Sequence, residues 1–173
     1  MKRLIVDMDD VLADATGRLI DLYEKEFGVR VTRESMNHKE DRERFPDNEA
    51  ALRFVFQKGF FSAMSVNEHA QEVMKELNKK YEVFVVSSAM EFPNSLAEKL
   101  EWLKEHFPFL NWKQFVFCGK KSVVHGDYMI DDLPHNLETF NGEKLLFSAP
   151  HNLQYNHLKR VHGWKEVGEI LLG

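Results

Sequence analysis

The chain has one cysteine, Cys118, among its 173 residues, so no disulfide can form within it. A reducing compartment is the simplest setting for such a chain. It also lacks an apolar run long enough to span a membrane, and no apolar signal region precedes the first acidic residues. We therefore expect a cytoplasmic protein without a membrane partner.

Positive charge is also in short supply. The 23 lysines and arginines are outnumbered by 28 acids, which leaves a net charge of -5 and no basic stripe. This argues against a nucleic-acid polymer as partner, because phosphate backbones are bound by clustered cations. A small phosphate-bearing molecule stays compatible, since a metal ion can neutralise its charge locally. No internal repeat is present, and 43% hydrophobic with 29% charged residues is typical of one globular domain with at most a small appended subdomain.

The most informative stretch is a short apolar strand followed at once by acids. Leu4-Ile5-Val6 is followed by Asp7, Asp9 and Asp10. Burying unpaired carboxylates is very costly, so we expect them where the strand ends and opens into a cleft. The two-residue period of a strand puts Asp7 and Asp9 on the same side. Two converging carboxylates are a plausible site for Mg²⁺.

The rest of the chain alternates between predicted strands and helices, which indicates a mainly parallel sheet with helices on both faces. Further strands are predicted over residues 81–86, 115–117, 128–130 and 144–147, with a last helix over 164–171. Because the carboxyl ends of parallel strands share one edge, the polar residues after these strands should lie together. They are Ser87, Lys121 and Asp131-Asp132.

Residues 15–64 are predicted to be a helical insertion between the first strand and the rest of the sheet. Its first helix should end at Gly28, and Asp47 should cap a second helix. Residues 29–48 are rich in charge and are expected to form a solvated helical face or loop.

Two helix starts after this insertion are predicted from capping patterns. Ser65 or Asn67 should cap the next helix, and Ser95 with Glu98 should form a capping box. The buried stripe of the latter helix is expected to be Leu96, Leu100 and Leu103.

The side chains expected at the sheet edge suit phosphoryl transfer. Mg²⁺ would lie between Asp7, a nearby carbonyl and Asp131 or Asp132. Asp7 would attack phosphorus to form an acyl phosphate, while Asp9 would protonate the leaving alcohol and later activate water. Lys121 would offset the clustered negative charge, and Ser87 would hydrogen-bond the transferring phosphoryl group. These residues predict a phosphatase with a covalent intermediate.

The same residues resemble a known family. Asp7-Met8-Asp9, Ser87, Lys121 and Ile130-Asp131-Asp132 look like the four ordered motifs of haloacid dehalogenase (HAD) superfamily phosphatases. A closer similarity, to the 5'(3')-deoxyribonucleotidases, is carried by segments 7–14, 58–61, 121–124 and 147–152.

The resemblance implies a HAD-like Rossmannoid three-layer α/β fold, with a core over residues 1–14 and 65–173 and a C1-type helical cap over 15–64. It also implies Mg²⁺-dependent hydrolysis of (deoxy)nucleoside monophosphates. Asp7 would be the nucleophile, and Asp9 would be acid/base and a carbonyl ligand of the metal. Ser88 and Phe61 are further candidates for substrate contact.

The chain departs from the family pattern at three places. Asp10 replaces the usual glycine, and we predict that its carboxylate faces away from the metal, towards the cap or solvent. Glu91 stands where relatives commonly have a lysine near the phosphate, and it would repel phosphate unless it points away. An aromatic pair that lines the base pocket of the animal enzymes has no clear match between Arg33 and Asp41.

Two alternatives remain open from the sequence. The first keeps the chemistry but acts on another small phosphomonoester, such as a sugar phosphate. The second is a nucleotide-binding protein without turnover, against which the presence of Asp9 argues, because a binding module needs no acid/base residue. A homodimer is left open as well.

Overall fold

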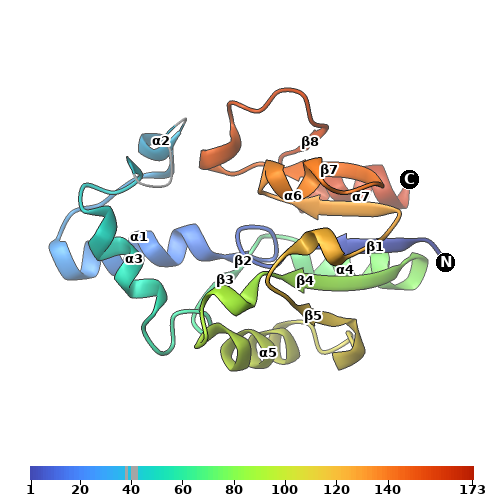
Figure 1. Ribbon diagram of the computed structural model, residues 1–173, viewed down its shortest axis with the longest axis horizontal. Helices are drawn as coiled ribbons and strands as arrows, with labels where there is room; N and C mark the ends of the chain where they lie inside the picture. Colours follow the sequence, from blue (N-terminus) through green and yellow to red (C-terminus); the bar gives the residue numbers. More distant parts are fainter. Residues whose placement is uncertain (38, 40–42) are drawn as a thin grey trace.

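A computed structural model describes residues 1–37, 39 and 43–173 (Figure 1). Its central feature is a six-stranded parallel sheet in the order β5-β4-β1-β6-β7-β8, which confirms the predicted architecture. The strands are β1 (Arg3–Val6), β4 (Glu82–Ser87), β5 (Phe115–Phe117), β6 (Tyr128–Asp131), β7 (Glu143–Phe147) and β8 (Arg160–Val161). The short β8 was not predicted.

The first strand lies in the middle of this sheet because it is apolar on both sides. Leu4, Ile5 and Val6 are all fully buried. Leu4 and Val6 belong to one apolar cluster and Ile5 to a second one, as the alternation of a strand requires. Asp7, which directly follows β1, therefore lies at the centre of the carboxyl edge.

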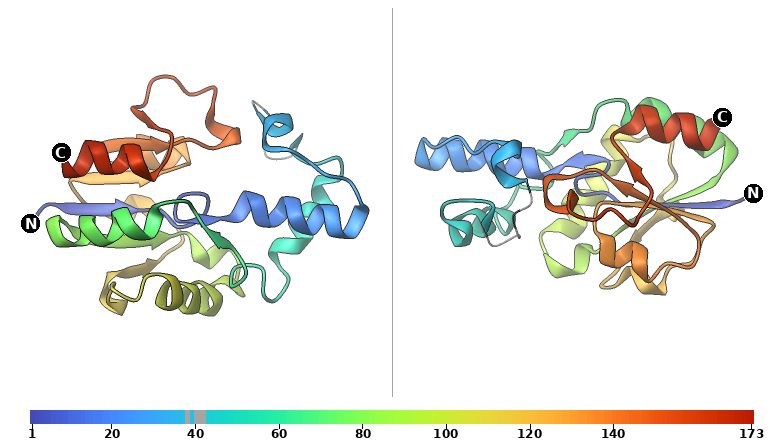
Figure 2. Two further views of the ribbon diagram at one scale, coloured as in Figure 1. Left: turned by 180° about the vertical axis from the view of Figure 1, so that it is seen from behind. Right: turned by 90° about the horizontal axis from the view of Figure 1, so that it is seen from above.

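Helices cover both of these apolar faces. The cluster around Leu4 includes residues of α4 (Ala70–Lys80), α5 (Ser95–His106) and α7 (Trp164–Leu172), and the cluster around Ile5 includes Leu137 of α6 (Pro134–Glu138). The helices α4 and α7 lie side by side (Figure 2). No helix in the described part of the chain has the length and apolar character that a membrane span requires.

Three helices lie beyond the carboxyl edge of the sheet (Figure 1). They are α1 (Ala15–Phe27), α2 (Arg33–Met36) and α3 (Asn48–Val55). The chain enters them through β2 (Ala13–Asp14) and returns through β3 (Ser65–Val66), and these two strands pair antiparallel. The two ends of the predicted 15–64 insertion thus lie on one short ribbon, although its status as a separate domain stays a prediction.

Two local predictions within the insertion are confirmed. Gly28 ends α1 in the left-handed conformation, with a φ of 66° that favours glycine. The side chain of Asp47 caps α3 by accepting a hydrogen bond from the Ala50 N–H. Within the charge-rich segment 29–48, residues 38 and 40–42 lie outside the described part of the chain.

The predicted caps before α4 were wrong. Ser65 belongs to β3, and α4 begins after His69, which has a φ of 63° and makes no side-chain cap. The Asn67 amide instead donates to the Val11 carbonyl over 2.8 Å. The Asn67 side chain therefore satisfies the backbone carbonyl of Val11, which is distant in sequence, and does not cap the nearby helix.

The predicted capping box of α5 was also wrong. The Ser95 hydroxyl donates to the Ala89 carbonyl at 2.7 Å, and the Glu98 carboxylate accepts from the backbone N–H groups of Gly59 and Phe61 at 2.7 and 3.0 Å. The buried face of α5 carries Ser95, Lys99, Trp102 and Leu103, so Leu103 is buried as predicted, whereas Leu96 and Leu100 are only half-buried. This rotation of the helix brings a lysine into the interior.

Candidate active site

Asp7 begins the site because it directly follows β1. Its backbone N–H donates to the Ile130 carbonyl at 2.9 Å, which extends the strand ladder by one residue. The chain then turns tightly, and the N–H groups of Leu12 and Ala13 both donate to the Met8 carbonyl. The Asp7 carboxylate is held by the Met8 N–H at 2.7 Å. The turn therefore fixes Asp7 at the sheet edge.

Lys121 contacts both Asp7, directly after β1, and Asp131, at the end of β6. It opens the short 3₁₀-helix η4 (Lys121–Val123) after β5 and is buried. Its ammonium lies 2.5 Å from Asp7 Oδ1 and 2.7 Å from Asp131 Oδ2. The two carboxylates outweigh the cost of burial and raise the pKa of Lys121.

Asp131 and Asp132 complete an acidic cluster with Asp7. One ligand oxygen of each lies within 4.8 Å of the others, and all three residues are buried. Asp131 also accepts hydrogen bonds from the Leu133 N–H at 2.9 Å and from the Asn136 amide at 3.1 and 3.2 Å. Lys121 and these donors thus contact both oxygens of Asp131, whereas Asp132 contacts His151 through Oδ2.

The cluster carries more negative charge than one lysine neutralises. Burial, followed by the nearby acids Asp131, Asp132 and Asp9, raises the pKa of Asp7 well above its usual range despite Lys121. Burial, followed by the charges of Asp131 and Asp10, does the same for the pKa of Asp132. Oxygen donors under mutual repulsion fit a hard divalent cation such as Mg²⁺, which would relieve the repulsion.

Asp9 and Ser87 meet at a second lysine, which the sequence reasoning missed. Ser87 ends β4 and is buried. The Lys99 ammonium donates to Ser87 Oγ at 2.9 Å and to Asp9 Oδ2 at 2.5 Å. The other oxygen of Asp9, Oδ1, has no hydrogen-bond partner within the described residues. The site thus holds two carboxylates two positions apart, each with its own lysine.

Comparison with known proteins places the chain in a nucleotidase family, in agreement with the acidic cluster described above. The whole chain, residues 1–173, matches the family model described as "5' nucleotidase, deoxy (Pyrimidine), cytosolic type C protein". The chain belongs to this family. It is also 41% identical over 180 residues to the 5'(3')-deoxyribonucleotidase of Bacillus subtilis, an alignment that covers 99% of this chain and 100% of that protein.

Solved structures agree on the fold. A haloacid dehalogenase-like hydrolase from Streptococcus pneumoniae superposes with a TM-score of 0.60 at 12% identity, covering 98% of each chain. The HAD-hydrolase YfnB of Bacillus subtilis, solved bound to magnesium, superposes with a TM-score of 0.59 at 11% identity and 99% coverage of each chain. As a member of the 5'-nucleotidase family with a HAD-like fold, the chain is a phosphomonoester hydrolase.

The backbone conformation at position 10 explains why an aspartate can stand where the family usually has glycine. Its φ is 56°, in the left-handed region where glycine is favoured and aspartate is one of the tolerated residues. Its two carboxylate oxygens accept from the Thr16 N–H and hydroxyl, both at 2.7 Å. The side chain is thus directed at the start of α1, while its orientation away from the metal stays a prediction. It also approaches Asp132 and His151, a neighbourhood that the sequence did not predict.

Lys99, rather than the residue at position 91, places a cation beside Ser87. Glu91 lies in the 3₁₀-helix η2 (Ala89–Glu91) and is exposed, so it does not project into the buried cluster. Lys99 is the fifth residue of the next helix, α5. Its position four residues after Ser95 and three before Trp102 on one helix face was the available signal.

The remaining substrate-contact candidates differ in exposure. Ser88 is half-buried next to Ser87. Phe61 is 2% exposed, and the Lys99 ammonium lies 4.6 Å from its ring centroid. Phe61 therefore contacts Lys99 of the site. Direct contact of Ser88 and Phe61 with substrate stays a prediction.

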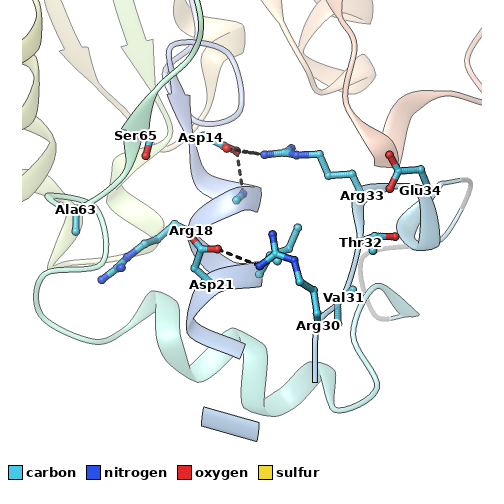
Figure 3. A pocket seen from close by; sticks show the side chains of 12 residues that line it. Asp14, Arg18, Asp21, Arg30, Val31, Thr32, Arg33, Glu34, Ala63 and Ser65 are labelled. Carbon is cyan, nitrogen blue, oxygen red and sulfur yellow. Dashed lines mark hydrogen bonds and ion pairs between the residues drawn. The ribbon is translucent and has the colours of Figure 1, made fainter. Parts of the chain in front are cut away.

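A pocket of about 460 Å³ lies beside the ribbon that joins the insertion to the sheet (Figure 3). Arg33 reaches across it to Asp14 at 2.5 Å, and Arg30 lies 3.7 Å from Asp21. Gly17 lines the pocket as well, and a Cβ atom there would approach Asp14 Oδ2 to 2.2 Å. None of the residues predicted to be catalytic or metal-binding lines this pocket.

Proposed function

We propose that this chain hydrolyses (deoxy)nucleoside monophosphates to nucleoside and phosphate, with Mg²⁺ and through an aspartyl-phosphate on Asp7. The observation that carries the proposal is the pair of acids with separate lysines. Lys121 contacts Asp7, and Lys99 contacts Asp9 and Ser87. This arrangement supports two different roles for two carboxylates that are close in sequence.

Metal binding is assigned to Asp7, the backbone carbonyl of Asp9, and Asp132, with Asp131 supporting. When bound, Mg²⁺ would neutralise phosphate charge and help to orient the phosphoryl group. The fit rests on the buried three-carboxylate cluster and its raised pKa values.

In the first chemical step, an Asp7 oxygen attacks phosphorus while the bond to the leaving alcohol breaks. Asp9 donates a proton to that alcohol oxygen. Lys121 keeps Asp7 oriented, and Lys99 with Ser87 binds the oxygens of the transferring phosphoryl group. In the second step, Asp9 takes a proton from water, the water oxygen bonds to phosphorus, and the bond between Asp7 and phosphorus breaks.

An aromatic row next to Lys99 favours a nucleotide over a sugar phosphate. Phe61 lies against Lys99, its ring centroid is 6.0 Å from that of Phe92, and Phe92 meets Phe56 edge-on at 5.1 Å. Phe56 is 56% exposed. A cation at one end and exposed aromatic surface at the other suit a molecule with a phosphate and a flat base.

The decisive experiment measures Mg²⁺-dependent phosphate release across deoxyribonucleoside and ribonucleoside monophosphates and sugar phosphates. We expect the highest kcat/KM with a deoxyribonucleotide. Release from sugar phosphates alone would mean that the enzyme uses the same chemistry on a different phosphomonoester. Absence of release from every compound would favour a nucleotide-binding protein without turnover.

Variants test the two carboxylate roles. Asp7→Asn should abolish turnover while leaving the fold intact, and Asp9→Asn should slow breakdown of the aspartyl-phosphate. Asp21→Asn, on the exposed side of α1, is the matched control and should retain activity. Wild-type rates in Asp9→Asn would refute the assigned mechanism.

A further inference from the structure

A polar segment after β7 lies against the proposed metal ligand Asp132. It contains the 3₁₀-helix η5 (Pro150–Asn152), and His151 within it is buried with 8% exposure. His151 Nε2 lies 2.8 Å from Asp132 Oδ2. This histidine has no role in the chemistry described above, yet it touches a carboxylate on which metal binding depends.

The segment that carries His151 is firmly anchored. Asn152 is fully buried, and its amide donates to the backbone carbonyls of Asp132 and Phe147, both at 2.8 Å. Its Oδ1 accepts from Arg160 at 2.7 Å, and a second Arg160 nitrogen donates to the Asn152 carbonyl at 2.9 Å. The side-chain amide of Asn152 therefore ties the segment to the backbone of Asp132.

His151 also faces a second acid. One ligand atom each of Asp10, Asp132 and His151 lies within 4.8 Å of the others. Asp10 is held in place by Thr16 at the start of α1. The imidazole thus lies near a carboxylate of the metal cluster and near a carboxylate held by the insertion.

Asp131 and Asp132 are oriented by different kinds of partner. Asp131 is surrounded by Lys121, Asn136 and a backbone N–H. For Asp132, the polar partner from the β7–β8 side is His151. A carboxylate anchored at one oxygen keeps a defined plane and presents its other oxygen for coordination.

We propose that His151 is a positioning residue that orients the Asp132 carboxylate for the divalent cation, on a segment anchored by Asn152 and Arg160. The inference rests on the proposed function for the role of Asp132 as a ligand. It assigns no proton transfer and no substrate contact to His151. Its consequence is a specific effect on metal affinity.

The test compares His151→Ala with His151→Gln, in which an amide restores a polar partner at similar reach. Metal binding is measured on the full chain by Mn²⁺ titration followed by electron paramagnetic resonance, and by the rise in melting temperature with Mg²⁺. His151→Ala should weaken metal affinity by about 10- to 100-fold, and His151→Gln should remain within about threefold of the wild type. At saturating Mg²⁺, kcat should recover in both variants.

His162→Gln is the matched control, because His162 is exposed and its ring contacts Ser148 of the same segment. It should bind metal as the wild type does. If His151→Ala does not fold, His151→Leu keeps the volume and removes the polar contact. Metal affinity unchanged in the folded apolar variant would overturn the proposal.

The two proposals fail in distinguishable ways. Metal binding that depends on His151, without phosphate release from any nucleotide, would overturn the proposed function and leave this inference standing. Nucleotide hydrolysis whose Mg²⁺ dependence is the same in the wild type and His151→Ala would do the reverse.

Discussion

Replacing Lys99 with methionine removes one positive charge from the buried centre of the site and leaves most of the side-chain volume in place. In the wild type the ammonium contacts Asp9 Oδ2 and Ser87 Oγ, and it lies over the Phe61 ring. If Lys99 binds the phosphoryl oxygens, the variant loses a charge-assisted hydrogen bond to the substrate.

Such a bond contributes about 1.5–3 kcal/mol, and each 1.36 kcal/mol in the barrier changes the rate about tenfold, so kcat/KM should fall roughly 10- to 150-fold. The free energy of unfolding should change by less than the transition-state stabilisation does. The Asp9 side chain is 36% exposed, so it can be hydrated once its partner is gone, and the buried ammonium no longer has to be desolvated. A net change of about 1 kcal/mol would move the melting temperature by roughly 2–4 °C.

The assay is phosphate release from the best deoxyribonucleotide at saturating Mg²⁺, with thermal unfolding measured on the same samples. Lys104→Met is the matched control, since it removes the same charge from an exposed position of the same helix. Lys99→Met with kcat/KM within about threefold of the control would refute the assignment of Lys99 to phosphate binding.

Three further outcomes are expected. Asp132→Asn should raise the melting temperature of the metal-free protein at neutral pH and remove the stabilisation of the protein by Mg²⁺. The reason is that the pKa of Asp132 is raised in the folded state. The stabilising contribution of the wild-type carboxyl group is therefore present at low pH and is lost as the pH rises through that pKa, at about 1.4 kcal/mol per pKa unit. A pH series of metal-free melting temperatures checks this, and the wild type should lose stability relative to Asp132→Asn as pH increases. Glu91→Gln should leave kcat/KM within about twofold of the wild type, since the side chain is exposed, and a large gain in phosphate affinity would contradict this placement. Glu98→Ala should lower stability by about 2–3 kcal/mol in urea unfolding, because the backbone N–H groups of Gly59 and Phe61 lose their acceptor, whereas the exposed Glu101→Ala should be close to neutral.

The sheet and most of its edge were predictable from sequence because their signals are local. A buried apolar strand followed by a polar residue appears at Asp7, Ser87 and Asp131, and parallel pairing then brings those residues together without further information. Lys121 followed from the same rule. The order of elements was therefore sufficient to assemble these side chains.

The second lysine was not predictable in this way. Lys99 stands between Glu98 and Leu100, in a pattern that equally favours a leucine stripe facing the core. Which face of α5 turns inward depends on its packing and on its partners Asp9 and Gly59, which lie far away in the chain. The same holds for Asn67, whose amide serves a carbonyl of the first turn. Local capping rules cannot account for a partner that only the fold brings near.

The paired ribbon of β2 and β3 has a consequence for how this enzyme could change its substrate. Asp14 and Ser65 are direct partners, so the chain leaves the sheet and returns to it at the same point. The parallel strand pairing that spaces Asp7, Ser87 and Asp131 does not pass through α1, α2 or α3. Divergence of the intervening helices can therefore alter what the site accepts while the hydrolytic machinery stays as it is, and the two can evolve at different rates.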